Sequence, residues 1–453
     1  MNVVFRSPVG ALLARPWVDS VGLFGLRRWY LPMSRLWAAA NAAGDDVAQF
    51  RGGIGTALSG VWSDASLARL LRRHRVAQEG AAGARAAWEA AAFAAQPGDP
   101  AVLDHQRRVA ATRHLSTRGR FYPLLFGADI PAARWQIVPP GEIERDFGGT
   151  APNPAQLYAA PAAPVGFTVS PSFTRAGVRQ YWLKAPTPAS RLARRAGSEM
   201  TYARMIEPVG TTACETLIFG SGLCLELELL NLSEDPGARL ARAGWRVVEP
   251  ISPYHGLRAM PGFYGGEPFF AAGPTSAVDL VAGQTIETAA LVGWCRSRFD
   301  GPVAVAGISM TSFVAQQVAS HCGTWPAAMR PDAVMLISHS GRMQATAFGG
   351  ELSAALGLER ALRDAGWTPD GLARLSRALD PAEAPALAPS RIVSVLGETD
   401  RWVPYEDGLD LARRWKLPEQ NVFRYPLGHL GMPVQLVRDA APFERLRQVL
   451  RDA

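Results

Sequence analysis

Residues 301–329 contain no Asp, Glu, Lys or Arg, and this charge-free run restricts the fold of the chain more than any other feature. The run is long enough to span a bilayer, but it holds three Gly, two Pro, several Ser, two Gln and His321. A membrane-spanning helix is not built this way. A buried strand, a sharp turn and a buried helix would have the same composition. We therefore predict a strand–turn–helix unit in the core of a soluble globular protein.

From residue 166 onward, short apolar runs alternate with segments of helical pattern. Helical segments lie between most of the later runs, for example at 236–243 and 283–298. This alternation predicts an α/β fold, with a doubly wound, mostly parallel sheet and helices on both faces. Residues 341–388 exceed what a crossover requires, so we expect a cap insertion over the carboxyl edge of the sheet. The expected strands are 166–170, 200–206, 216–219, 245–251, 303–308, 333–337, 391–396 and 422–425.

The length of 453 residues exceeds that of one ordinary domain, and the sequence changes character near residue 165. We predict an N-terminal helical, arginine-rich region over 1–165 and an α/β domain over 166–453. Residues 151–164 contain four Pro and six Ala and no charge, which suits a semi-rigid connector.

Two helices of the N-terminal region are expected to form a hairpin. The first begins at Ser63 or Ser66 as the N-cap and continues to Phe93, where QPGDP ends it. Asp99, which is followed by Pro, starts the second helix over 102–115.

The net charge of +7 belongs almost entirely to the N-terminal region. Residues 1–165 hold 18 basic and 12 acidic side chains, and the rest of the chain holds 29 and 28. The excess does not indicate nucleic-acid binding, and a solvated helical face with some ion pairs is the interpretation we favour. The alternative is peripheral membrane contact through this basic region.

The cysteines indicate neither a disulfide framework nor a metal site, because they form no C-x-x-C pair and no zinc-like spacing with His. We expect reduced, mostly buried thiols, no metal and no cofactor. The N-terminal apolar run is interrupted by Pro8, Arg15 and Pro16, so we predict no signal peptide and a cytoplasmic location, with attachment to a membrane surface as the alternative. The four cysteines are Cys214, Cys224, Cys295 and Cys322.

The charge-free run contains a candidate nucleophile elbow, PVAVAGISMTSFVAQQVAS. Ser309 falls between the predicted strand and the predicted helix. A tight turn at this place lifts the serine hydroxyl above the sheet and directs the N–H of the next residue, Met310, toward a developing oxyanion.

A serine nucleophile requires an imidazole base and a carboxylate that orients it. Of the three histidines beyond Ser309, His321 lies in the helix after the elbow and His339 lies just past the next strand. His429 follows the last predicted strand in YPLGHLGM, so we assign it as the base. Asp400 stands three residues after the strand-ending glycine in RIVSVLGETDRWVP, and we assign it as the acid. The nearby carboxylates are interpreted as loop solvation, namely Glu398, Glu406 and Asp407.

A second oxyanion donor is expected from the loop after the third strand. Ser221 and Gly222 follow TLIFG there, and glycines let backbone N–H groups turn toward the site. A plain glycine turn is the competing interpretation. Tyr254 and His255 in the SPYHG loop end the next strand and are substrate-binding candidates, although structural roles for both residues fit equally well.

Over residues 166–453 the sequence resembles the α/β-hydrolases grouped with abhydrolase-domain-containing protein 18. The resemblance is carried by GFTVSP, FGSG, SPYHG followed by Arg258, QTIETAALVGW leading to GISM, and TDRWVP with GH. It implies the α/β-hydrolase fold, a triad of Ser309, Asp400 and His429, and action on acyl esters, lipids included. The N-terminal third matches that family much less clearly.

The elbow departs from the family pattern at Thr311 and Ser312, where such proteins usually have Gly-Gly. Glycine two residues after the nucleophile relieves crowding, so a β-branched Thr311 predicts a slightly altered elbow.

These observations together predict a serine hydrolase that cleaves a carboxylic ester, with a thioester and acyl transfer as variants of the same chemistry. The substrate is expected to be a small-molecule or lipid acyl ester. The alternative is a catalytically silent α/β-hydrolase scaffold that binds a ligand or a protein partner, for which Thr311 is the sequence support.

Overall fold

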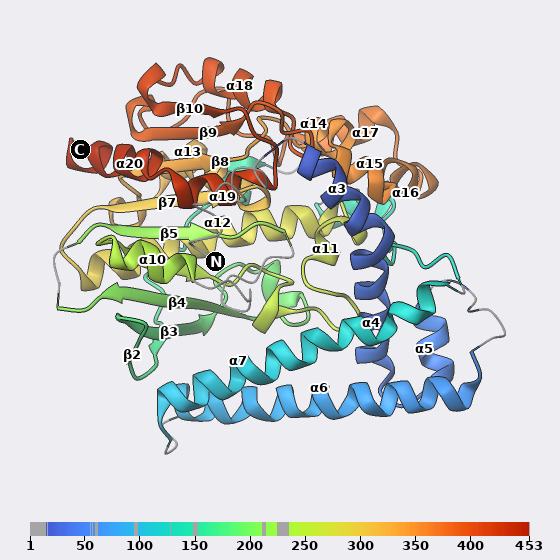
Figure 1. The fold of residues 1–453 in the computed structure, drawn as a ribbon. Helices are drawn as coiled ribbons and strands as arrows, with labels where there is room; N and C mark the ends of the chain where they lie inside the picture. The colour runs from blue at the N-terminus through green and yellow to red at the C-terminus, as the bar shows by residue number, and fades with distance from the viewer. Residues whose placement is uncertain are drawn as a thin grey trace.

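A ten-stranded mixed sheet forms the centre of the molecule (Figure 1). The structure is a computed structural model that describes residues 15, 17–54, 56, 58, 62–94, 98–126, 128–147, 153–210, 214–223 and 235–452. In this part of the chain the strand order is β1-β3-β4-β6-β5-β7-β8-β9-β10, and β2 pairs with β3. The strands are β1 Thr168–Val169, β2 Phe173–Arg175, β3 Val178–Pro186, β4 Met200–Pro208, β5 Thr216–Gly220, β6 Arg246–Pro250, β7 Val303–Ile308, β8 Ala333–Ile337, β9 Ile392–Gly397 and β10 Val422–Tyr425.

The sheet has a parallel part and an antiparallel end. Strands β6, β5, β7, β8, β9 and β10 pair in parallel. Strand β4 runs antiparallel to both β3 and β6, and β1 and β2 pair antiparallel to β3. The mostly parallel, doubly wound sheet predicted from the sequence is therefore confirmed.

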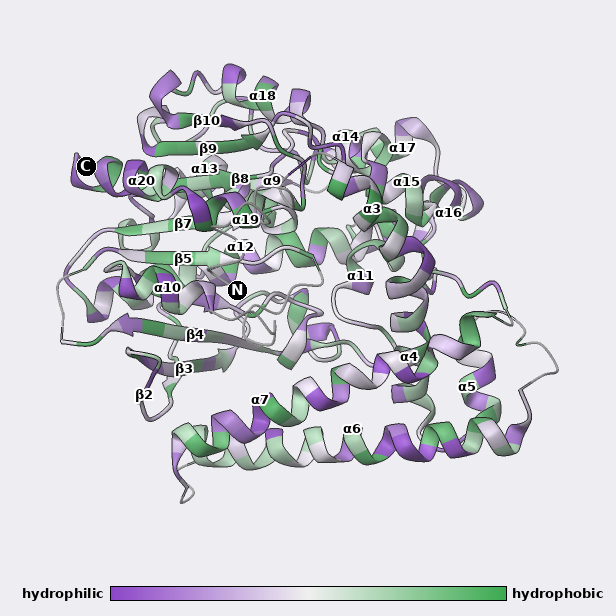
Figure 2. Cartoon of the chain, in the orientation of Figure 1, coloured by the Kyte–Doolittle hydropathy of each residue, from purple (hydrophilic) through white to green (hydrophobic). Residues whose placement is uncertain are grey.

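Helices cover both faces of the parallel part. On one face the core includes side chains of α12 (Thr275–Arg298), α13 (Met310–His321) and α18 (Tyr405–Arg414). On the other face it includes side chains of α10 (Pro236–Arg242), α19 (Gly431–Arg438) and α20 (Ala441–Arg451). Strand β7 supplies Val303 and Val305 to the first core and Ala304 and Ala306 to the second. Figure 2 shows the central strands in mainly hydrophobic colours. Burial on both faces explains why the run that includes β7 carries no charge.

The observed strands agree with the predicted ones except at the antiparallel end. The long strand β3 and the short strand β2 were not predicted, because Gln180 and Lys184 interrupt the apolar pattern of β3. Gln180 is nevertheless buried, since its side-chain oxygen accepts hydrogen bonds from Arg175 and Arg204. Helix α12 begins at Thr275, eight residues before the predicted start, because its first two turns are also buried.

In the N-terminal region, helices α6 and α7 lie beside β3 at the antiparallel end of the sheet, and α3 lies near the cap helices (Figure 1). Ser63 caps α6 by accepting the N–H of Ser66, and Asp99 caps α7 by accepting two N–H groups. Helices α6 and α7 form the expected hairpin. The helices are α3 Trp17–Gly25, a π-helical turn Leu26–Tyr30, α4 Leu31–Ala43, α5 Val47–Ile54, α6 Asp64–Phe93, α7 Pro100–Ser116, a 3₁₀ segment Thr117–Phe126, α8 Pro140–Asp146 and α9 Pro154–Leu157.

Buried contacts join this region to the rest of the molecule. Trp88 on α6 packs edge-to-face on Trp182 of β3, with ring centroids 5.2 Å apart. Arg35 on α4 forms an ion pair with Glu267 on α11 (Glu267–Ala271), and neither side chain is exposed. Within the described part of the predicted connector, Tyr158 is buried and its hydroxyl donates to the carbonyl of Ala378 at 2.7 Å.

The segment predicted as a cap forms four short helices beyond the carboxyl ends of the parallel strands (Figure 1). They are α14 Met343–Gly349, α15 Glu351–Leu356, α16 Leu358–Asp364 and α17 Pro369–Ser376. Among the described residues, no helix combines the length and apolar character needed to cross a membrane.

Candidate active site

Ser309 occupies a tight turn between β7 and α13. Its backbone has φ 55° and ψ −116°, in a region that residues other than Gly rarely adopt. The Ser309 N–H donates to the carbonyl of Ile337 at 2.9 Å, which fixes the turn to the neighbouring strand. A Cβ at Gly307 would lie 2.1 Å from the carbonyl oxygen of Thr311, so only glycine fits there. This is the backbone geometry expected of a nucleophile elbow.

Thr311 fits into this turn because Gly220, at the end of β5, makes room for it. A Cβ at Gly220 would lie 2.8 Å from Thr311 Cβ. The Thr311 hydroxyl accepts the N–H of Ile308 at 3.0 Å and lies 3.2 Å from the Ile308 carbonyl oxygen. The crowding expected from a β-branched residue is therefore relieved on the adjacent strand, and the hydroxyl adds local hydrogen bonds to the turn.

Ser309, His429 and Asp400 come together above the carboxyl ends of the strands. His429 Nε2 lies 3.0 Å from Ser309 Oγ, and His429 Nδ1 lies 2.7 Å from Asp400 Oδ2. Asp400 Oδ1 accepts the N–H groups of Trp402 and Val403, each at 3.0 Å. The carboxylate is buried and oriented by the backbone on one side and by the imidazole on the other.

The other histidines and acids near the site have different roles. His321 stacks on Tyr158, and His339 Nε2 lies 2.8 Å from Ser394 Oγ. Asp407 is not a solvated loop carboxylate, as the sequence suggested. It is buried and accepts the N–H groups of Gly341 at 2.7 Å and Arg342 at 2.8 Å, where the cap begins.

The environment of His429 favours its charged form. Burial alone would lower the pKa of the imidazole, but the charge and hydrogen bond of Asp400, together with the charge of Asp19, raise it above its usual value. Such an imidazole readily takes up a proton from a neighbouring hydroxyl.

Two residues that sequence reasoning missed contact His429. Trp402 stacks on the imidazole with ring centroids 5.3 Å apart and an interplanar angle of 19°. Asp19 on α3 accepts the backbone N–H of His429 and, at 2.9 Å, that of Leu430. Trp402 lies inside the TDRWVP motif and was available as a signal, whereas Asp19 is 410 residues from His429 and no local pattern marks it.

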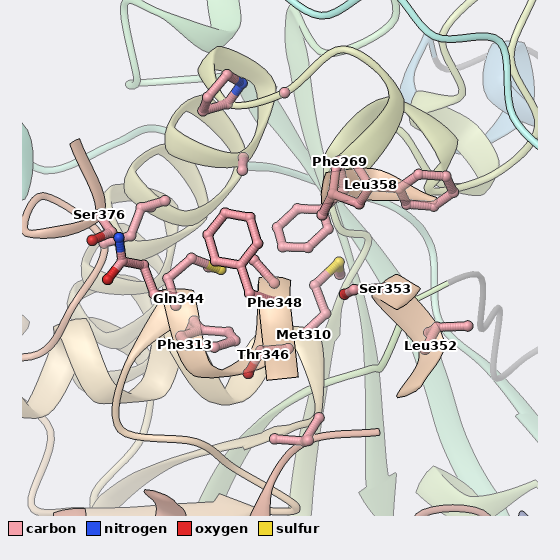
Figure 3. A pocket seen from close by; sticks show the side chains of 18 of the residues that line it. Phe269, Met310, Phe313, Gln344, Thr346, Phe348, Leu352, Ser353, Leu358 and Ser376 are labelled. Atoms are coloured by element: carbon pink, nitrogen blue, oxygen red, sulfur yellow. The ribbon is translucent and has the colours of Figure 1, made fainter. Parts of the chain in front are cut away.

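An apolar cavity opens beside Ser309 and His429. Its volume is about 140 Å³, similar to the ~150 Å³ of an engineered cavity that binds benzene. Figure 3 shows Phe269, Met310, Phe313 and Phe348 around this space. The cap forms much of the wall, through Met343, Gln344, Thr346, Ala347, Phe348, Leu352, Ser353, Leu356, Leu358, Leu362, Leu372, Leu375 and Ser376.

The predicted oxyanion residues lie next to the elbow. Met310 is the first residue of α13 and lines the cavity. Ser221 and Gly222 follow Gly220, which pairs with Gly307 across β5 and β7. Neither Ser221 nor Gly222 lines the cavity, although the next residue, Leu223, does.

The two substrate-binding candidates of the SPYHG loop do not line the cavity. Tyr254 is buried in the apolar cluster beneath it. His255 is buried as well, and its Nδ1 lies 2.8 Å from the carbonyl oxygen of Pro253. Burial lowers the pKa of His255 to about 4, so this imidazole is neutral at physiological pH.

Cysteine and metal chemistry have little support in the described residues. Cys214, Cys295 and Cys322 are free thiols, and burial raises the pKa of Cys322 to about 11. Cys224 lies outside the described residues. In the part of the chain that the structure describes, no group of three or more His, Cys, Asp or Glu side chains is arranged to hold a metal ion.

Comparisons with known proteins found distant structural likenesses only. No protein-family model matches the sequence, and no curated protein matches it. Solved structures that resemble it include acetyl xylan esterase 1 from Thermoanaerobacterium sp., 14% identical with a TM-score of 0.44, over 64% of this chain and 92% of that one. Another is an S-formylglutathione hydrolase from Agrobacterium tumefaciens, 15% identical with a TM-score of 0.38, over 62% and 99%. A third is brefeldin A esterase, a bacterial homologue of human hormone-sensitive lipase, 17% identical with a TM-score of 0.37, over 68% and 85%.

The sheet order, the antiparallel strand β4 and the elbow between β7 and α13 define an α/β-hydrolase fold. The likenesses to solved structures are distant. The narrower resemblance to the abhydrolase-domain-containing protein 18 family stays a prediction.

Proposed function

We propose that this protein is a serine hydrolase that cleaves a carboxylic ester through an acyl-enzyme on Ser309. The observation that carries the proposal is the chain of contacts Ser309 Oγ to His429 Nε2 at 3.0 Å and His429 Nδ1 to Asp400 Oδ2 at 2.7 Å, at the wall of an apolar cavity. Nucleophile, base and orienting acid are within hydrogen-bonding reach of one another, which is the arrangement that acyl transfer requires.

In the first half of the reaction, Ser309 Oγ attacks the carbonyl carbon and its proton passes to His429 Nε2. Asp400 accepts the hydrogen bond from His429 Nδ1–H, which keeps Nε2 free to act as the base and stabilises the imidazolium that forms. The imidazolium then gives the proton to the leaving alcohol or thiol as the bond from the carbonyl carbon breaks.

The tetrahedral oxyanion requires hydrogen-bond donors on the other side of the carbonyl. We assign the backbone N–H of Met310 and that of Ser221, with Gly222 giving the loop its freedom. One such donor is worth about 3 to 4 kcal/mol of barrier height. In the second half of the reaction, water attacks the acyl-enzyme with His429 as the base, and an alcohol in place of water would give acyl transfer.

The cavity supports a medium-sized apolar acyl group as the bound part of the substrate. Its wall is mostly aliphatic and aromatic, and one aromatic ring or a short alkyl chain fills a volume near 140 Å³. A lipid or a thioester substrate is compatible with this chemistry, since either can place an acyl chain against Phe269, Phe313 and Phe348.

Labelling with a fluorescent fluorophosphonate tests the proposal directly. We expect covalent labelling of the native chain and none of Ser309→Ala. Ser312→Ala is the matched control, because it removes another hydroxyl of the same turn, whose Oγ donates to the Ser309 carbonyl. We expect this variant to be labelled. A folded native chain that takes no label would overturn the hydrolase proposal and favour the catalytically silent scaffold.

A series of p-nitrophenyl esters tests the substrate class. We expect kcat/KM to rise with acyl length until the chain fills the cavity and to fall beyond it, because each buried methylene contributes about 0.8 kcal/mol. A profile that is flat from acetate to dodecanoate would argue against the cavity as the acyl site.

A further inference from the structure

The N-terminal helix α3 reaches into the active site through a single carboxylate. Asp19 accepts the backbone N–H of His429 and that of Leu430, 2.9 Å away for the second, and its own exposed fraction is only 5%. Two consecutive N–H groups bound by one carboxylate form a charge-assisted pair that fixes the two peptide groups on either side of the His429 Cα.

The packing around Asp19 is specific to this contact. A Cβ at Gly428 would lie 2.2 Å from Asp19 Oδ2, so the carboxylate approaches the loop only because residue 428 is glycine. One helical turn away, a Cβ at Gly22 would lie 2.3 Å from Leu430 Cδ1, so α3 also packs closely against the next residue of the loop. The helix and the loop that carries His429 are therefore in tight contact at both positions.

We propose that Asp19 is a positioning residue for His429, and that the N-terminal region thereby forms part of the active site. By holding the two peptide groups on either side of the His429 Cα, it keeps the imidazole between Ser309 and Asp400. Its negative charge, like that of Asp400, also favours the imidazolium. The contact between Asp19 and the loop that carries His429 does not depend on the proposed hydrolase function. Only the effect of this contact on catalysis rests on that function.

Asp19→Asn tests this role, because it keeps the size of the side chain and removes the charge. We expect kcat to fall roughly tenfold, with little change in KM for the best p-nitrophenyl ester. The acid limb of the pH profile should move to lower pH, since only Asp400 then raises the pKa of His429. Asp45→Asn, which affects a surface ion pair with Arg75 on the same side of the molecule, should match the native chain.

An NMR titration of His429 in labelled protein tests the role of Asp19 separately from the proposed hydrolase function, because the measurement requires no enzymatic activity. A lower pKa of His429 in Asp19→Asn supports positioning by Asp19 even if no substrate is hydrolysed. Native values of both kcat and the His429 pKa in folded Asp19→Asn would overturn it. If that variant does not fold, Gly428→Ala displaces the carboxylate while keeping its charge, and an unchanged kcat there would overturn the proposal equally.

A different observation concerns the outer face of the same helix. Trp17, Val21 and Phe24 lie at helical spacing and are 51%, 58% and 59% exposed, and Trp29 beyond them is 40% exposed. Arg27 and Arg28 are exposed beside this row, and the one carboxylate of α3, Asp19, is buried on the opposite face. The surface thus combines aromatic and aliphatic side chains with positive charge alone.

This surface lies near the cavity. On the opposite face of the same helix, Asp19 accepts the backbone N–H of His429, and His429 lines the cavity. Exposed Trp and Phe with adjacent arginines are the composition of helices that lie in the headgroup layer of an anionic membrane. The arginines would also attract an acidic protein, but such a partner would not explain why four apolar side chains of this surface are exposed.

We infer that this surface, Trp17, Val21, Phe24, Arg27, Arg28 and Trp29, binds an anionic lipid surface. Together with the proposed hydrolase function, it implies that acyl esters reach the cavity from a lipid–water interface. Binding itself is independent of catalysis, so the test uses Ser309→Ala, which removes any hydrolysis of the lipid.

The test is co-sedimentation of full-length Ser309→Ala with vesicles of equal parts phosphatidylcholine and phosphatidylglycerol. We expect binding that weakens with salt, and at least a tenfold weaker affinity after Trp17→Ser, Val21→Ser and Phe24→Ser in combination, because these side chains supply most of the apolar area that the lipid would bury. Val76→Ser, Val102→Ser and Val109→Ser remove exposed apolar side chains from α6 and α7 and serve as the control. Absence of vesicle binding, or an equal loss in both triple variants, would overturn the inference, as would a dimer in solution that the α3 variant dissociates.

Discussion

His74 and His114 in the N-terminal region and His429 in the α/β domain share their residue type and partial or full burial, yet their surroundings shift their pKa values in opposite directions. Burial, then the neighbouring His114 and Arg120, lowers the pKa of His74 to about 3. Burial and Arg118 lower that of His114 to about 4. At His429, two carboxylates outweigh burial and raise the pKa.

The partners explain the difference. In the N-terminal region, Asn41 Oδ1 lies 2.8 Å from Nε2 of both His74 and His114, and this neutral oxygen leaves the rings uncharged. In the α/β domain, Asp400 binds Nδ1 of His429 and leaves Nε2 facing a hydroxyl. The first arrangement holds helices together, and the second can move a proton.

Removing the imidazoles is expected to have the largest effect and tests the difference between the two regions directly. If the proposed function holds, we expect His429→Ala to lower kcat for an ester by about 10⁶-fold, the loss known for the histidine of a serine protease triad, with little change in the unfolding midpoint. His74→Gln should do the reverse, destabilising the fold and leaving kcat unchanged in folded protein. Steady-state kinetics and urea denaturation of both variants check this, and a large kcat loss in His74→Gln would contradict the division of roles.

The next largest effect concerns the ion pair that joins the two regions. Arg35→Ala leaves Glu267 buried without its cation, and we expect a loss of about 3 to 5 kcal/mol in the free energy of unfolding. Arg75→Ala, which removes an exposed ion pair with Asp45 and Glu79, should cost at most about 1 kcal/mol. Equal losses in these two variants would mean that the buried pair is not what joins the regions.

The elbow provides a test of packing within the α/β domain. Gly220→Ala brings a Cβ within 2.8 Å of Thr311, and we expect a loss of about 1 to 3 kcal/mol of stability from overpacking, with reduced fluorophosphonate labelling. Adding Thr311→Gly should restore both quantities, because it removes the opposing side chain. A double variant no better than Gly220→Ala alone would show that Gly220 serves another purpose.

The last effect is the dependence of stability on pH. His74 and His114 bind protons near pH 6.5 when unfolded but only near pH 3 to 4 when folded, so stability falls as pH drops from 6.5 toward 4. Each histidine contributes up to about 1.4 kcal/mol per pH unit in this window. His429 has the opposite sign, because its raised pKa adds stability that is present below pH 6.5 and is lost as pH rises through the folded value.

Urea denaturation at pH 7, 6 and 5 measures this slope. His74→Gln combined with His114→Gln should make the dependence shallower, although His255 and His339, whose burial lowers the pKa to about 4, retain part of it. An unchanged slope would mean that the N-terminal pair is not the acid-sensitive element.

Local patterns predicted the parts of the site that depend on neighbours in sequence. The charge-free run gave the strand, turn and helix around Ser309, because burial on all sides excludes charged side chains over a continuous segment. The strand-end positions of Asp400 and His429 followed from the parallel sheet, whose carboxyl ends share one edge. Strand β3 was missed because Gln180 is buried by hydrogen bonds that only tertiary contacts supply.

The sequence by itself therefore determined the fold class and the residues that meet at Ser309, since hydrophobic periodicity and strand order act over short distances along the chain. Only the tertiary structure revealed that Gly220 accommodates Thr311, that Trp402 stacks on His429, and that Asp19 binds the peptide after Gly428. These contacts join residues 27 to 410 positions apart. The TDRWVP motif marks Trp402 but not its partner, and no local pattern around Gly220 or Asp19 records the space or the charge that each provides.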